Sequence, residues 1–245
     1  MTTRGKTIVF LGPTLKHAAA QKLCPAEFRG PAAMGDITCA VSDGAELIVL
    51  VDGVFESGPS VWHKEIMWAI SCGIPVIGTS SMGALRAAEL DHHGMMGYGE
   101  VYEDFATGRL NDDDEVAVLH GPPETSWLPL TDAMVDIRYH ANNAVAAGVL
   151  THLQAACVIA HAKAEFFKRR SFIASSTTVL NETSVRRQAL SWYTSQSSGI
   201  KEKDCSSLLS NLQSVSADAQ KILQNRSAFL PTVYLSRLQE FGFVP

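Results

Sequence analysis

The sequence lacks the features that mark membrane proteins, nucleic-acid-binding proteins, zinc proteins and secreted proteins. No apolar run approaches the roughly 20 residues that a helix needs to cross a bilayer, and no cluster of Lys and Arg marks a nucleic-acid surface. The five cysteines form no CxxC pair and no zinc-type spacing with histidine, so a reducing compartment fits them best. Residues 1–6 lack the apolar segment of a signal peptide. We therefore expect a cytoplasmic protein with neither membrane nor nucleic-acid partners.

The charge of the 245-residue chain is divided unevenly. Residues 1–120 carry 8 Lys/Arg against 16 Asp/Glu, a net of −8, whereas residues 121–245 carry 12 against 9, a net of +3. The segment 121–132 between these halves contains three prolines and is the best candidate for a boundary. This pattern predicts two domains, residues 1–122 and residues 123–245.

Three apolar segments in the first half predict strands, namely 7–12, 47–51 and 74–77. None of them alternates with polar residues, which is typical of strands covered on both faces of a parallel sheet. Each is followed by a helix signal, with Thr14, Ser60 and Ser81 as the expected N-caps. The order of strands and helices predicts an α/β fold with a parallel, doubly wound, Rossmann-like sheet.

The second half shows helical spacing and few strand signals. We expect an all-helical C-terminal part with helices over 132–148, 152–170, 183–195, 204–225 and 232–241.

Ligands of open parallel sheets bind outside the carboxyl ends of the strands. Three loops are expected at that edge: Gly12–Thr14, Asp52–Phe55 and Gly78–Gly83. The helices that follow these loops begin at the same edge, and helix N-termini favour anions. The first expectation is therefore an anionic or oxyanion-forming ligand.

Ser81 and His63 are the candidate catalytic pair at this edge. Ser81 matches half of the G-x-S-x-G nucleophile elbow, although Thr79 stands where the first glycine belongs, and an ordinary N-cap is the alternative role. His63 is expected in the first turn of a helix, either as a general base or as a structurally satisfied histidine. Asp52 either orients His63 or stabilises the turn at Gly53.

Arg86 has two candidate roles. It either anchors a carboxylate-like group of a substrate or forms a surface pair with Glu89, three residues along the same helix.

Cofactor motifs are not supported. Residues 78–83 have the glycine spacing of a P-loop, but Ala84 and Leu85 replace the lysine and the hydroxyl residue, so neither ATP nor NAD is expected. The acidic run Asp112–Glu115 is interpreted as solvated or partner-facing rather than as a metal site. The basic triplet Lys168–Arg170 most simply complements a helix dipole.

Taken together, the motifs of residues 7–120 resemble the TfuA-like family. The resemblance is carried by Gly12-Pro13, Gly35-Asp36, Asp52–Phe55, His63–Ile66, Ser81–Leu90, Gly94-Met95 with Gly97, and Asp113–Ala117.

The resemblance implies a partner of YcaO-type cyclodehydratases, which use ATP to activate backbone amides during thioamide formation. It further implies contact with a ubiquitin-like sulfur carrier, whose C-terminal thiocarboxylate would be hydrolysed to supply sulfide. A non-catalytic adaptor that docks carrier and YcaO enzyme is the alternative, and a general serine hydrolase is a third. We expect substrate contacts from Arg86, Gly12, Thr14, Asp36, Gly78, Ser80 and Gly83.

Overall fold

The computed structural model describes residues 5–196, 198–224 and 240. Contacts divide the chain into two compact units, one of residues 1–111 with 204–245 and one of residues 112–203. These divisions differ from the expected domain boundary at 122/123, which stays a prediction. Of the helix expected over 232–241, all residues except Glu240 lie outside the described part.

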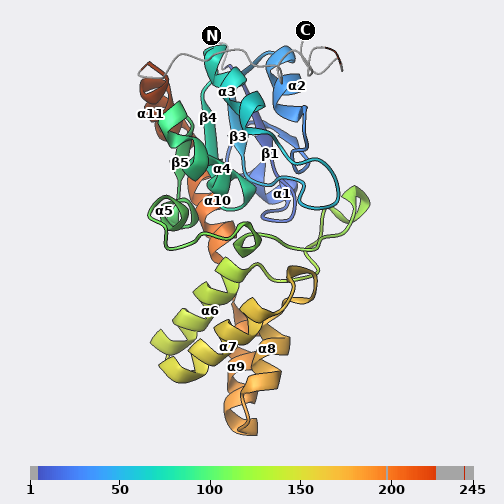
Figure 1. The fold of residues 1–245 in the computed structure, drawn as a ribbon, viewed down its shortest axis with the longest axis vertical. Coiled ribbons are helices and arrows are strands. Elements are labelled where there is room, and N and C mark those ends of the chain that lie inside the picture. Colours follow the sequence, from blue (N-terminus) through green and yellow to red (C-terminus); the bar gives the residue numbers. More distant parts are fainter. Residues whose placement is uncertain (1–4, 197, 225–239, 241–245) are drawn as a thin grey trace. The chain divides into compact units, whose positions relative to one another are not determined.

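The first unit contains a five-stranded sheet in which every neighbouring pair is parallel, so the α/β prediction is confirmed. The strand order is β2-β1-β3-β4-β5, and Figure 1 labels β1, β3, β4 and β5 of this sheet. The three predicted strands are present, and the short edge strands β2 and β5 were not expected from the sequence. The strands are β1 (Lys6–Phe10), β2 (Glu27–Arg29), β3 (Ala45–Leu50), β4 (Val76–Thr79) and β5 (Met96–Tyr98).

Helices cover both faces of this sheet, which explains why its central strands lack polar alternation. Ile48 and Leu50 of β3 pack with α2 (Asp36–Ser42), α3 (His63–Ser71) and α4 (Met82–Leu90). Leu47 and Val49 face the opposite way, toward α1 (His17–Ala20), α10 (Ile200–Ser210) and α11 (Leu212–Gln224). Residues 204–224 thus complete the sheet unit. The unit also contains α5 (Glu100–Ala106) and a 3-10 turn, η1 (Asp91–His93).

Two predicted N-caps are wrong. Helix α1 begins at His17, because the Thr14 hydroxyl donates to Asp52 Oδ1 at 2.6 Å instead of capping a helix. Helix α3 begins at His63, and the Ser60 hydroxyl donates to the carbonyl of Val54 at 2.7 Å. In both cases the hydroxyl group donates its hydrogen bond to an acceptor outside the helix.

The second unit is helical, as predicted. Its helices enclose a core of their own, to which Met134, Val158, Phe172 and Ala189 contribute. One helix was expected over 152–170, but the observed helix ends at Ala164. A separate helix begins at Phe172. The elements are α6 (Met134–Ala146), α7 (His152–Ala164), α8 (Phe172–Val179) and α9 (Thr183–Ser195), with 3-10 turns η2 (Asp113–Glu115), η3 (Pro123–Thr125) and η4 (Phe167–Arg169).

None of the helices within the described residues combines the length and the apolar character required to traverse a bilayer.

Candidate functional site

Asp52 connects the loops that follow β1 and β3. Its Oδ2 accepts hydrogen bonds from the backbone N–H groups of Gly12 (2.9 Å) and Thr14 (3.0 Å), and its Oδ1 accepts the Thr14 hydroxyl at 2.6 Å. The side chain is only 1% exposed. In a sheet of order 2-1-3-4-5, these two loops flank the point where the strand order reverses. Gly12, Thr14 and Asp52 are therefore brought together as predicted, but in a hydrogen-bonded loop clamp.

The chain after β2 also packs against the loop that follows β3. Ala32 forms a parallel bridge with Gly53, donating to the carbonyl of Asp52 at 2.9 Å and accepting from Val54 at 2.8 Å. A Cβ atom on Gly53 would lie 3.3 Å from the carbonyl oxygen of Ala32 and 2.8 Å from the Met82 side chain. Backbone groups that would otherwise face a ligand are thus used within the protein.

The turn between β4 and α4 is strained at Ser80 rather than at Ser81. Ser80 has φ of 65°, and Ser81 N–H donates to the carbonyl of Thr79 at 2.7 Å, which are the marks of a γ-turn centred on Ser80. Gly78 lies two residues before Ser80, where the first glycine of the elbow belongs, but Met82 stands at the place of the second glycine. Ser80 is fully buried and Ser81 is 7% exposed.

Gly78 and Gly83 allow the backbones of β4, α4 and β3 to touch. A Cβ atom on Gly78 would lie 2.0 Å from the carbonyl oxygen of Gly83, and one on Gly83 would lie 1.8 Å from that of Leu50. The N–H of Gly83 is also used, donating to Val51 at 3.0 Å. The geometry accounts for both glycines by close packing, while substrate contact there stays a prediction.

Glu65 is a buried carboxylate that the sequence did not single out. Its Oε2 accepts the N–H groups of Gly35 (3.0 Å) and Ile37 (3.2 Å) at the start of α2, and its Oε1 accepts that of Trp62 (2.8 Å). Burial raises the pKa of Glu65 to about 7, and the three N–H donors only partly oppose this. Asp36 lies beside it and accepts the N–H of Ala33 at 2.7 Å. Both carboxylates thus hold the start of α2, which is a structural role.

His63 and Arg86 meet at Glu89. His63 Nε2 lies 2.8 Å from Glu89 Oε2, and Arg86 Nη1 donates to the same oxygen at 2.6 Å. Arg86 Nε also donates to the carbonyl of Val61 at 3.3 Å, which fixes the guanidinium from a second side. The His63 side chain is 44% exposed and that of Arg86 13%. The surface pair of Arg86 with Glu89 is therefore present, and His63 completes a three-residue cluster on α3 and α4.

No hydrogen bond joins Ser81 or Asp52 to His63 within the described residues. Glu89, which holds His63, lies eight residues beyond Ser81, about 12 Å along the axis of α4. Asp52 uses both carboxylate oxygens in the clamp. The orienting carboxylate next to His63 is therefore Glu89, for which the sequence offered only the spacing to Arg86.

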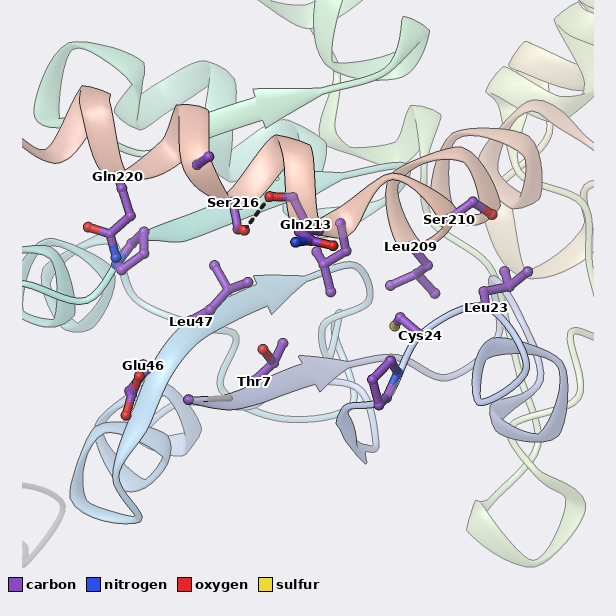
Figure 2. Close-up of a pocket in the computed structure, with 15 residues that line it drawn as sticks. Thr7, Leu23, Cys24, Glu46, Leu47, Leu209, Ser210, Gln213, Ser216 and Gln220 are labelled. Atoms are coloured by element: carbon purple, nitrogen blue, oxygen red, sulfur yellow. Dashed lines mark hydrogen bonds between the residues drawn. The ribbon is translucent and has the colours of Figure 1, made fainter. Parts of the chain in front are cut away.

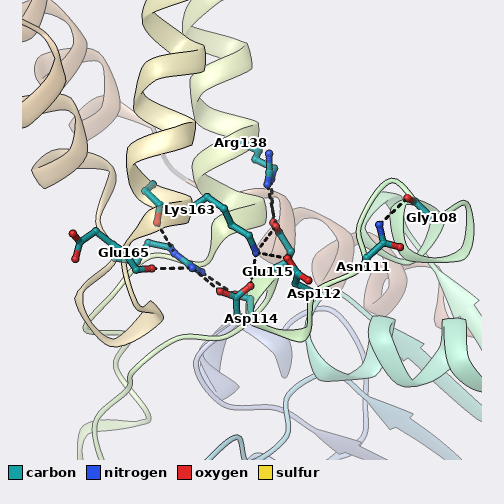
Figure 3. A network of polar contacts seen from close by, with 10 residues as sticks. Gly108, Asn111, Asp112, Asp114, Glu115, Arg138, Lys163 and Glu165 are labelled. Carbon is teal, nitrogen blue, oxygen red and sulfur yellow. Dashed lines mark hydrogen bonds and ion pairs between the residues drawn. The ribbon is translucent and has the colours of Figure 1, made fainter.

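The acidic run at the start of the second unit is internally paired (Figure 3). Asp112, Asp114 and Glu115 present oxygens within 4.8 Å of one another, a spacing that suits a metal ion. However, Lys163 Nζ lies 2.9, 2.5 and 2.9 Å from these three carboxylates. The ammonium group thus occupies the position that a cation would take.

Arg138 and Arg170 complete this network. Arg138 forms a bidentate ion pair with Glu115, in which Nη2 donates to Oε1 at 2.9 Å and Nε donates to Oε2 at 3.0 Å. Arg170, fully buried, donates to Asp114 Oδ2 at 2.7 Å and to the carbonyls of Ala162 and Glu165 near the end of α7. The basic triplet therefore does more than complement a helix dipole, and the expectation that the acidic run is solvated or partner-facing does not hold for Asp114 and Glu115.

A cavity of about 560 Å³ lies at the other edge of the sheet, near the amino ends of β1 and β3 (Figure 2). Leu47, Leu209 and Gln213 help to line it, and its lining includes no Lys, Arg or His. Cys24 also faces this cavity, and burial raises the pKa of its thiol, which disfavours the reactive thiolate. The lining thus offers no cationic side chain to an anion, and its Cys24 thiol is held in the less reactive protonated form.

Comparison with known proteins gives one family match. The family model described as TfuA-like protein matches residues 52–171. The match begins later than the resemblance noted in the sequence and extends further, to residue 171. A search of curated proteins found no match.

Proposed function

Because residues 52–171 place this chain in the TfuA-like family, we propose that it hydrolyses the thiocarboxylate of a ubiquitin-like sulfur carrier and supplies sulfide to a YcaO-type cyclodehydratase. Family membership supports the broader role in thioamide-related modification of a ribosomal peptide or protein together with a YcaO enzyme. In this proposal the YcaO enzyme uses ATP to activate the amide, and this chain needs no cofactor of its own.

The chemistry of the substrate sets the requirements. A thiocarboxylate is anionic and resonance-stabilised, which makes its carbon a poor electrophile. A hydrolase must therefore neutralise this charge, stabilise the oxyanion of the tetrahedral intermediate and activate a nucleophile.

The observation that carries the proposal is the cluster of His63, Glu89 and Arg86. A half-exposed imidazole held by a carboxylate is suited to activate water. The adjacent Arg86 uses Nε and Nη1 within the protein, and its Nη2 has no hydrogen-bond partner among the described residues, so it can bind a thiocarboxylate. The nucleophile is a water molecule in this account. Ser81 is the alternative nucleophile, which would have to form an acyl-enzyme without direct contact to His63.

The test is sulfide release from a thiocarboxylated carrier protein by the isolated chain. We expect release by the wild type, a loss of at least about a hundredfold in His63→Ala, and little loss in Ser81→Ala. Equal rates in His63→Ala, shown to be folded by its thermal transition, would overturn the assignment of His63. A strong loss in Ser81→Ala would favour the acyl-enzyme route.

A non-catalytic adaptor is the competing function, and a general serine hydrolase is a weaker one. The adaptor hypothesis used the acidic run as a surface for a basic partner, but Asp112, Asp114 and Glu115 are paired with Lys163. An absence of sulfide release by the wild type, combined with binding of carrier and YcaO enzyme, would favour the adaptor.

A further inference from the structure

Glu89 is shared by two nitrogen-bearing side chains that come from different helices. It lies on α4, and its Oε2 is approached by His63 of α3 at 2.8 Å and by Arg86 of its own helix at 2.6 Å. Its side chain is 37% exposed, so the cluster forms at the surface of the sheet unit. The two contacts hold this carboxylate in one place.

The charge state of Glu89 follows from its neighbours. Burial alone would raise the pKa of its carboxyl, but the hydrogen bond from His63 and the charge of Arg86 outweigh this effect and lower the pKa. Glu89 is thus an ionised carboxylate, which only accepts hydrogen bonds. In the contact with His63 the proton must therefore be on Nε2 of the ring.

A neutral imidazole carries one proton, so its lone pair is then on Nδ1. Among the described residues, Nδ1 of His63 has no hydrogen-bond partner. The side chain is also 44% exposed, so a water molecule can reach the ring. One nitrogen is held by the protein and the other is open to a reactant.

We propose that Glu89 is a positioning residue for the hydrolysis, which keeps the proton of His63 on Nε2 so that Nδ1 is the atom that accepts a proton from water. The inference rests on the proposed function. It assigns to Glu89 the orienting role that the sequence suggested for Asp52, whose carboxylate is committed to Gly12 and Thr14.

The proton and the leaving group can be followed through the step. The oxygen of water bonds to the thiocarboxylate carbon while Nδ1 takes one of its protons, and the imidazolium now faces the Glu89 carboxylate through Nε2–H. The tetrahedral intermediate then collapses with cleavage of the C–S bond. The sulfur leaves with the proton returned from Nδ1 and the proton of the attacking oxygen, giving hydrogen sulfide and a carrier carboxylate. No oxidant or reductant is required.

The kinetic test compares Glu89→Gln with wild type in sulfide release from the thiocarboxylated carrier. We expect kcat to fall at least about tenfold with a small change in KM. Glu103→Gln, which removes an exposed carboxylate from α5, is the matched control and should change neither quantity.

A second measurement does not depend on activity. The pKa of Glu89, followed by NMR of its labelled carboxyl carbon, should rise in His63→Ala because a hydrogen bond that lowers it is removed. An unchanged pKa of Glu89 would overturn the pairing, and an unchanged kcat in Glu89→Gln would overturn the positioning role. If the wild type itself releases no sulfide, the proposed function is wrong and the role of Glu89 falls with it.

Discussion

The hydroxyl of Thr14 donates a 2.6 Å hydrogen bond to the carboxylate of Asp52, 38 residues away, across the point where the strand order of the sheet reverses. The same carboxylate holds two backbone N–H groups, so the edge of the sheet nearest to a typical ligand position is braced from within. The Asp52 carboxylate is thus used within the fold, and the reaction that we propose relies on side chains of α3 and α4.

Asp52→Asn should lower the free energy of unfolding by about 2 kcal/mol or more, because buried N–H donors then face an amide that cannot accept all of them. Thr14→Val removes a single hydrogen bond and should cost about 1 kcal/mol. Urea unfolding measures both. If Asp52→Asn is as stable as the wild type but inactive, Asp52 acts in the chemistry and not as a brace.

The stability of the protein should depend on pH through Glu65. Its folded pKa of about 7 lies above the usual value near 4.5, so the folded state binds this proton more tightly than the unfolded chain. The resulting stabilisation is complete below pH 4.5 and is lost as the pH rises from about 4.5 to about 7, by at most about 1.4 kcal/mol per unit. Urea unfolding of wild type and Glu65→Gln between pH 5 and pH 7.5 isolates this contribution. Parallel pH dependences in the two proteins would contradict it.

Lys163 should act as the built-in cation of the acidic cluster. In Lys163→Met, three neighbouring carboxylates lose their shared partner, so the thermal transition should fall and millimolar Ca²⁺ should partly restore it. Wild type should show no such rise with Ca²⁺. Lys221→Met, which breaks an exposed pair with Asp218, is the control and should have little effect in either condition. Stabilisation of wild type by Ca²⁺ would show that the site accepts a metal beside the lysine.

Gly83→Ala should destabilise the sheet unit by at least the 1–3 kcal/mol typical of an overpacked core, since its Cβ would meet the carbonyl of Leu50 at 1.8 Å. Gly58→Ala is the matched control, because the nearest atom to its Cβ is a methyl group of Val54 at 3.5 Å. Thermal or urea unfolding of the two variants should differ clearly. Similar stabilities would mean that α4 shifts to admit the methyl group.

The parts of the fold that the sequence predicted are those set by local composition. The three central strands are continuous apolar segments, and a strand buried on both faces must be apolar throughout. Helix α9 was predicted to the residue because its pattern is uninterrupted. The edge strands β2 and β5 were missed because three residues are too few to show a period.

The errors at the site have a different cause, which is the distance along the chain between partners. Glu65 and Glu89 look like ordinary helix carboxylates, yet their partners Gly35 and His63 lie 30 and 26 residues away. Arg170 likewise binds Asp114, 56 residues earlier. Spacing rules describe neighbours three or four residues apart, so only the folded structure identifies such partners.

The most direct test of the account follows the carrier itself. A thiocarboxylated carrier incubated with the isolated protein in H₂¹⁸O should lose its sulfur and gain one labelled oxygen at its C-terminal carboxylate, and His63→Ala should abolish this conversion. A carrier that keeps its thiocarboxylate with wild-type protein, or one converted equally fast by folded His63→Ala protein, would contradict hydrolysis by a water molecule that His63 activates.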